Sequence, residues 1–95
     1  MIKVVAKGLV KKNCLEKVLG LYKELVEKTR SEEGCLSYEL FQDTENPCIL
    51  TMIETWENRE FLERHFQTVH FRELVPQISE CREGKADLNV YTLVL

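Results

Sequence analysis

The sequence has no apolar run long enough to act as a signal peptide or to cross a membrane. Its first ten residues, MIKVVAKGLV, mix lysines with short apolar side chains. Internal repeats, low-complexity stretches and linkers are also missing, so we expect a single domain spanning residues 1–95. Together these absences favour a cytoplasmic protein, in which thiols stay reduced.

Paired cysteine motifs are missing as well. The sequence holds 4 cysteines, with no C-x-x-C pair and no histidine close enough to share a metal with them: Cys14, Cys35, Cys48 and Cys81. A zinc site and thioredoxin-like redox chemistry both need ligands or thiols at close spacing. We therefore expect no metal site and interpret the cysteines as small core or surface residues.

Positive charge is scarcer than negative charge. The chain has 13 Lys and Arg residues against 16 Asp and Glu residues, which gives a formal net charge of −3. A nucleic-acid partner would need a basic patch, and RNA-binding domains of ferredoxin-like fold carry a Lys/Arg-Gly-aromatic motif that this sequence lacks. We expect neither a nucleic acid nor a membrane as partner.

The chain is also short. A domain of 95 residues buries only about 60–65% of its unfolded surface, so a single core gives marginal stability. Disulfides, metals and self-association are the usual sources of extra stability in small domains. Since a reducing compartment and scattered cysteines disfavour the first two, self-association is the expected remedy.

Four segments have the alternation and the Val, Ile and aromatic content of β-strands: residues 2–10, 35–43, 48–57 and 86–95. Turn residues from Thr44 to Pro47 separate the second strand from the third, so these two are expected to form a hairpin. The first and third strands carry apolar side chains on both faces. We therefore expect both faces to be at least partly buried.

A first amphipathic helix is predicted between residues 13 and 34. Asn13 is a suitable N-cap, and Glu16 occupies the capping-box position three residues later. Gly34 is expected to end the helix, because glycine takes the left-handed C′ position without steric cost.

A second amphipathic helix is predicted after Asn58, which is a suitable cap. We expect this helix in pieces. A bend near residue 67, with a restart at Thr68, is the first break, and a second is expected near residue 75 because Pro76 does not fit an unbroken helix interior.

The predicted order is β-α-β-β-α-β, which is the ferredoxin-like α+β arrangement of a four-stranded antiparallel sheet with its helices on one face. Apolar residues on the other face then need a second sheet. The simplest source is a second copy of the chain, so we expect a homodimer.

Three segments are similar to a known family. EGCLSYELF at residues 33–41, IETWENREFLERH at 53–65 and QTVHF at 67–71 resemble the antibiotic biosynthesis monooxygenases, including their quinol monooxygenase members. The similarity extends over nearly the whole chain. It implies a dimeric α+β barrel that oxidises a small quinol or polyphenolic substrate with O2, without flavin, metal or any other cofactor.

The resemblance leaves other activities open. Relatives in the family degrade haem, isomerise signalling metabolites or have no assigned activity. The haem-degrading branch uses an Asn/Trp/His triad, whereas the matching positions here are Gly8, His65 and Val75, so haem degradation is not expected. Beside the monooxygenase, a binding or stress-response barrel without turnover and an isomerase of a small metabolite remain alternatives.

His65 is the candidate catalytic base. It lies on the apolar side of the second predicted helix, and imidazole titrates near neutral pH, as proton removal from a phenol requires. A structural histidine bonded to backbone or to a carboxylate is the alternative. His70 follows five residues later, which is not an aligned helical spacing, so the pair is a poor metal site and His70 is a weaker candidate for substrate contact.

Four further side chains are candidates for substrate binding: Tyr38, Glu54, Trp56 and Phe61. Trp56 could stack on a flat ring, and Tyr38 could donate a hydrogen bond to a substrate oxygen. Glu54 is costly to bury without a partner, and burial would raise its pKa. For Glu54 the alternatives are orienting His65 or pairing with an Arg or Lys; for the others the alternative is core packing.

Overall fold

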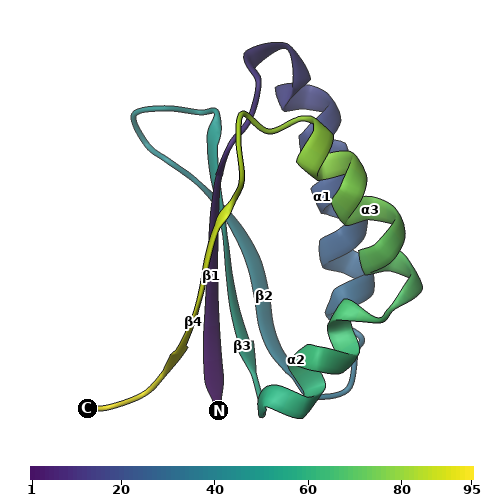
Figure 1. The fold of residues 1–95 in the computed structure, drawn as a ribbon, viewed down its shortest axis with the longest axis vertical. Helices are drawn as coiled ribbons and strands as arrows, with labels where there is room; N and C mark the ends of the chain where they lie inside the picture. Colours follow the sequence, from purple (N-terminus) through teal and green to yellow (C-terminus); the bar gives the residue numbers. More distant parts are fainter.

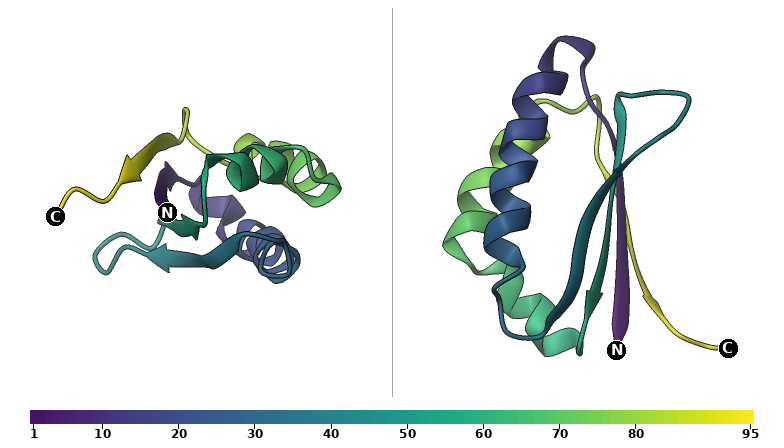
Figure 2. Two further views of the ribbon diagram at one scale, coloured as in Figure 1. Left: turned by 90° about the horizontal axis from the view of Figure 1, so that it is seen from below. Right: turned by 180° about the vertical axis from the view of Figure 1, so that it is seen from behind.

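A four-stranded antiparallel sheet carries three helices on one of its faces, as Figures 1 and 2 show for the computed structural model, which describes residues 1–95. The elements in chain order are β1 (Ile2–Leu9), the 3-10 helix η1 (Lys12–Cys14), α1 (Leu15–Thr29), β2 (Cys35–Gln42), β3 (Ile49–Trp56), α2 (Arg59–Phe66), α3 (Val69–Glu80) and β4 (Asp87–Thr92). The predicted ferredoxin-like order is confirmed. No helix combines the length and the hydrophobicity that a membrane span requires.

The strands are ordered β2-β3-β1-β4, and all neighbours are antiparallel. One row across the sheet pairs Tyr38 with Glu54, Glu54 with Val4, and Val4 with Val90. Because paired residues share a face, this row sets Tyr38 and Glu54 side by side under the helices. The last strand ends at Thr92, three residues earlier than the sequence pattern predicts.

The core lies between the sheet and the helices. Along β1 buried residues alternate with exposed or half-buried ones, and Val4 is 1% exposed. The opposite face of the sheet has no helix over it (Figure 2) and carries half-buried or exposed apolar side chains: Val5, Leu9, Phe41, Ile49, Ile53 and Tyr91. Within one chain, the expectation that the first strand is buried on both faces is therefore met on one face only.

The start and end of α1 differ from the prediction. Asn13 lies inside η1, and Cys14 precedes α1 without a side-chain capping bond, so Asn13 is not the N-cap. The helix ends at Thr29, and Gly34 lies beyond it, in the turn that leads into β2. Gly34 does have a left-handed φ of +82°, but it serves this turn and not the helix terminus.

The second predicted helix is broken once. Asn58 caps α2 by accepting a hydrogen bond from the Phe61 amide at 3.2 Å. Thr68 caps α3 by accepting from the Phe71 amide at 3.3 Å, so the break at residues 67–68 is confirmed. The second break is wrong, because α3 continues through Pro76. Pro76 is exposed, where water can bind the carbonyl that its missing N–H leaves free.

Replacing Gly34 with Ala should lower the free energy of unfolding by about 2–4 kcal/mol. The positive φ disfavours any side chain, and the added Cβ would overlap the Phe61 ring. Gly84→Ala is the matched control, since its φ is +81° but its Cβ would meet nothing within 4 Å. That variant should lose only about 1 kcal/mol. Urea unfolding of both variants measures the difference, and equal losses would contradict the contact with Phe61.

Candidate active site

A small, partly open cavity of about 90 Å³ lies between the sheet and α1 and α3. Its wall is apolar except at two places. Tyr38 and Glu54 form one polar part of the wall, and Tyr22 and Arg82 form the other. The row of paired strand residues explains the first pair, because it brings Tyr38 of β2 beside Glu54 of β3.

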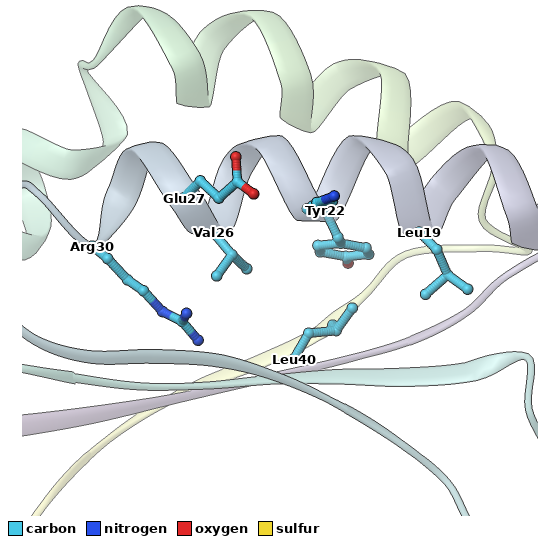
Figure 3. Close-up of a pocket in the computed structure, with 7 residues that line it drawn as sticks. Leu19, Tyr22, Val26, Glu27, Arg30 and Leu40 are labelled. Carbon is cyan, nitrogen blue, oxygen red and sulfur yellow. The ribbon is translucent and has the colours of Figure 1, made fainter.

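A wider groove of about 280 Å³ lies open to solvent between α1 and β2 (Figure 3). In this view Leu19 and Val26 point toward Leu40, whereas Glu27 points away from the strand. The Arg30 Nε donates to the Tyr38 carbonyl at 3.1 Å and so holds the end of α1 to β2. Its charged side chains, Lys23, Glu27 and Arg30, are all exposed to solvent. The smaller cavity, lined by the buried Tyr38 and Glu54, is therefore the better candidate for chemistry.

Glu54 is a buried carboxyl group without a cationic partner. It is 5% exposed, and its Oε1 accepts a hydrogen bond from the Trp56 Nε1 at 2.9 Å. Burial raises the pKa of Glu54 to about 7, although the bond from Trp56 opposes the shift. Of the roles expected for Glu54, pairing with an Arg or Lys is therefore absent, since no ion pair of the chain includes it.

Tyr38 stands between the cavity and His65. Its hydroxyl lies 3.4 Å from the His65 Nε2, and the residue is 2% exposed. Burial, followed by the nearby Glu54, raises the pKa of Tyr38 far above its usual value, so the hydroxyl stays protonated and can donate.

His65 is held by a carboxylate that the sequence analysis did not identify. The His65 Nδ1 lies 2.8 Å from the Glu32 Oε2, and the imidazole is 1% exposed. Because a carboxylate only accepts hydrogen bonds, we assign the proton to Nδ1 and leave Nε2 free to accept from Tyr38. Burial lowers the pKa of His65 despite the opposing effect of Glu32, so the ring is neutral at neutral pH.

His70 contacts the same carboxylate oxygen, with its Nε2 2.6 Å from the Glu32 Oε2. The sequence predicted the break at residues 67–68 but not that it would turn His70 back toward His65, where both rings reach one carboxylate. Glu32 lies in the turn before β2, 33 and 38 residues away from the two histidines. The sequence offered no periodic signal for it, only its position beside Glu33 and Gly34.

The same three side chains could hold a metal ion. One ligand atom from each of Glu32, His65 and His70 lies within 4.8 Å of the others. Two imidazole nitrogens and a carboxylate oxygen are a ligand set that zinc accepts. An ion there would replace both hydrogen bonds that Glu32 now accepts. A bound metal ion and the two hydrogen bonds to the histidines are therefore alternatives at this place.

The predicted site residues occupy different places around the cavity. Tyr38 and Glu54 line it, whereas His65 lies behind Tyr38. Trp56 is fully buried between Glu54 and His65, with its ring centroid 4.8 Å from that of His65. Phe61 lies away from the cavity, under Arg64, whose guanidinium is 5.2 Å from the ring centroid.

The polar contacts form a continuous chain from the cavity toward the surface. It runs from Tyr38 to His65, then to Glu32, and ends at His70, whose side chain is 16% exposed. A group in the cavity could therefore lose a proton, through Tyr38, to a neutral imidazole that is itself shielded from water.

Comparison with known proteins agrees with this geometry. The sequence model of antibiotic biosynthesis monooxygenases matches residues 1–77. A crystal structure described as an antibiotic biosynthesis monooxygenase is 40% identical, with a TM-score of 0.96 over 100% of both chains. A conserved protein from Methanosarcina mazei Go1 is 42% identical, with a TM-score of 0.93 over 95% of this chain and 89% of that one.

One relative is a longer protein. The uncharacterized protein sll1783 of Synechocystis is 32% identical over 84 residues, which are 88% of this chain but 57% of that protein. The chain thus spans little more than half the length of this relative.

Replacing Glu54 with Gln should remove a pH-dependent loss of stability. A carboxyl group whose pKa is raised from 4.5 to about 7 by folding binds its proton more tightly in the folded state. Its contribution is therefore complete below about pH 4.5 and is lost as the pH rises to about 7. Relative to the unaltered protein, Glu54→Gln should gain about 2 kcal/mol between pH 5 and pH 8. Urea unfolding at both pH values measures this, and a gain that is the same at both would contradict the buried, partly neutral carboxyl group.

Proposed function

The chain belongs to the antibiotic biosynthesis monooxygenase family, and from this we propose that it is a monooxygenase that oxidises a small quinol or polyphenol with O2, without a bound cofactor. The observation that carries the proposal is the small, mainly apolar cavity joined through Tyr38 to the neutral imidazole of His65, which the Glu32 carboxylate holds in place. The 4 free cysteines fit the reducing cytoplasm, which we propose as its compartment.

The chemistry asks for one proton transfer and a dry cavity. The substrate hydroxyl gives its proton to the Tyr38 oxygen as Tyr38 gives its own to the His65 Nε2, so no free tyrosinate forms. The phenolate then transfers an electron to O2, and the two radicals combine at a ring carbon that carries hydrogen. Loss of water from this peroxide leaves a carbonyl, so quinol and O2 become a hydroxyquinone and water, with all four electrons supplied by the substrate.

Each protein group has a distinct part in this scheme. Glu32 is a positioning residue, because its bond to Nδ1 fixes the tautomer in which the His65 Nε2 accepts. The developing imidazolium lies beside the Glu32 carboxylate, which stabilises its charge. The apolar wall keeps water away from the radical and peroxide intermediates.

A binding protein without turnover is the second candidate, and the size of the cavity favours it. Phe66 and Phe71 line the cavity and lie 5.2 Å apart between ring centroids, which leaves about 90 Å³. A cavity of about 150 Å³ accepts benzene, so a ring enters here only if these side chains move. Binding without oxygen consumption would identify this alternative.

Proteins of this family typically bind small molecules and form oligomers, and for this chain we propose a homodimer. The support is the helix-free face of the sheet, where Leu9, Phe41 and Tyr91 are 39%, 48% and 51% exposed. If a second copy packs its own helix-free face against this one, a two-fold axis relates the two copies. The same apolar side chains of both are then buried in the interface.

Oxygen uptake by the purified protein tests the proposed reaction. With hydroquinones, naphthoquinols or anthrones as substrates, uptake should exceed the spontaneous rate and should persist after treatment with EDTA. His65→Ala should lower kcat by about 10²–10⁴-fold, the usual contribution of a general base. Glu32→Gln should have a smaller effect, and His70→Gln, at the outer end of the chain of contacts, the smallest.

Two results would contradict this scheme. Uptake that His65→Ala leaves unchanged would remove His65 from the reaction while keeping the activity. Uptake that EDTA abolishes and zinc or another divalent ion restores would replace the cofactor-free scheme with metal chemistry at Glu32, His65 and His70.

Ile53→Lys tests the proposed dimer. Ile53 lies on the helix-free face of the sheet, paired with Val5 and Glu39, so a lysine there would place a charge inside the interface. Sedimentation equilibrium should show a dimer for the unaltered protein and a monomer for the variant. Val69→Lys is the control, because Val69 is 70% exposed on α3 and should leave the dimer intact. A dimeric Ile53→Lys protein would exclude this face as the interface.

A further inference from the structure

Arg82 places a guanidinium at the wall of the cavity without a carboxylate partner. Its Nη2 donates to the Tyr22 Oη at 3.0 Å and its Nη1 to the Ser79 Oγ at 3.3 Å. The Nε is buried and has no hydrogen-bond partner. None of the ion pairs of the chain includes Arg82. A cation in an apolar wall with a donor to spare favours an anion beside it.

The fold holds this side chain rigidly. The backbone of Arg82 forms an isolated β-bridge with Val10, just after α3 ends. A Cβ on Gly8 would lie 2.8 Å from the Arg82 Nε, so a side chain at position 8 would force the Arg82 side chain to move. Gly8 does not have a positive φ, so it is the close approach, and not the backbone conformation, that calls for glycine here.

Tyr22 supplies a second donor at the same place. Its hydroxyl oxygen accepts from Arg82, and its own O–H proton has no acceptor among the hydrogen bonds of the chain. Tyr22 is 3% exposed and lines the cavity together with Arg82. Two of the five guanidinium N–H groups donate within the chain, so three remain. Together with the Tyr22 O–H they supply donors for an oxyanion at one end of an otherwise apolar space.

We propose that, when Phe66 and Phe71 move aside to admit a ring, Arg82 and Tyr22 bind the anionic oxygen of a single-ring aromatic ligand, a carboxylate or a phenolate, whose hydroxyl points to Tyr38 at the other end. Gly8 lies four residues along β1 from Val4, the partner of Glu54, which is about 13 Å at the backbone. The ligand therefore lies lengthwise between the two polar parts of the wall. The inference rests on the proposed function only in taking this cavity as the substrate site.

Isothermal titration calorimetry with two matched ligand pairs tests the proposal, and it needs no turnover. The first pair is 4-hydroxybenzoate and its neutral isostere 4-hydroxybenzamide. The second is 4-nitrophenolate at pH 8.5 and neutral 4-nitroanisole, which separates a phenolate from a carboxylate. The unaltered protein should bind the anion of at least one pair more than 10-fold tighter than its neutral partner.

Substitutions then assign the preference to these residues. In Arg82→Met the ratio of the two dissociation constants should fall to about one, while the neutral ligand binds within about threefold of its original affinity. Tyr22→Phe, which keeps the ring and removes one donor, should lower the ratio several-fold. Arg64→Met removes an arginine whose side chain is 60% exposed on α2, so it should leave the ratio unchanged.

The proposal is overturned if neither anion is preferred, if no ligand of either pair binds, or if the preference survives in Arg82→Met. Tyr22→Phe guards against a folding defect in Arg82→Met, because it leaves the guanidinium in place. The proposed oxidation can fail separately: binding of the anion without any oxygen uptake would keep the anion site and exclude the monooxygenase. Oxygen uptake with neutral substrates alone would keep the monooxygenase and exclude the anion site.

Discussion

A single carboxylate oxygen, the Glu32 Oε2, holds the candidate site together. It accepts from His65 and from His70, so it joins the turn before β2 to both halves of the broken helix. The orientation of the His65 ring, and with it the nitrogen that faces Tyr38, follows from this contact. Without Glu32 the buried His65 would hold an N–H group that lacks an acceptor, an arrangement that proteins rarely tolerate.

Burial favours the neutral form of each ionisable group in or beside the cavity. It raises the pKa of Glu54 and Tyr38 and lowers that of His65, so each group is driven toward its neutral form. The wall near Tyr38 therefore holds little charge before a ligand enters. Arg82, at the other end, is the exception, because a guanidinium keeps its charge in proteins. This difference gives the cavity two unlike ends.

Local patterns predicted the elements, and contacts distant in sequence decided the site. Period and capping residues were enough for the four strands, the Asn58 cap and the break at Thr68, because those signals lie within a few residues. Three predictions about helix ends and breaks are wrong. Asn13 lies inside a 3-10 turn, Gly34 belongs to the turn before β2, and Pro76 is tolerated within α3 because it is exposed. Glu32 could not be found this way, since its partners are brought to it only by the folded chain.

The strand order has a consequence for how the domain forms during synthesis. β1, at the start of the chain, is a central strand whose second neighbour is β4, made after every other element. Until residues 87–92 leave the ribosome, one edge of β1 has no partner, and the cavity lacks Leu88 from its wall. The cavity is thus completed by β4, and a nascent chain has no finished cavity before this strand has been made.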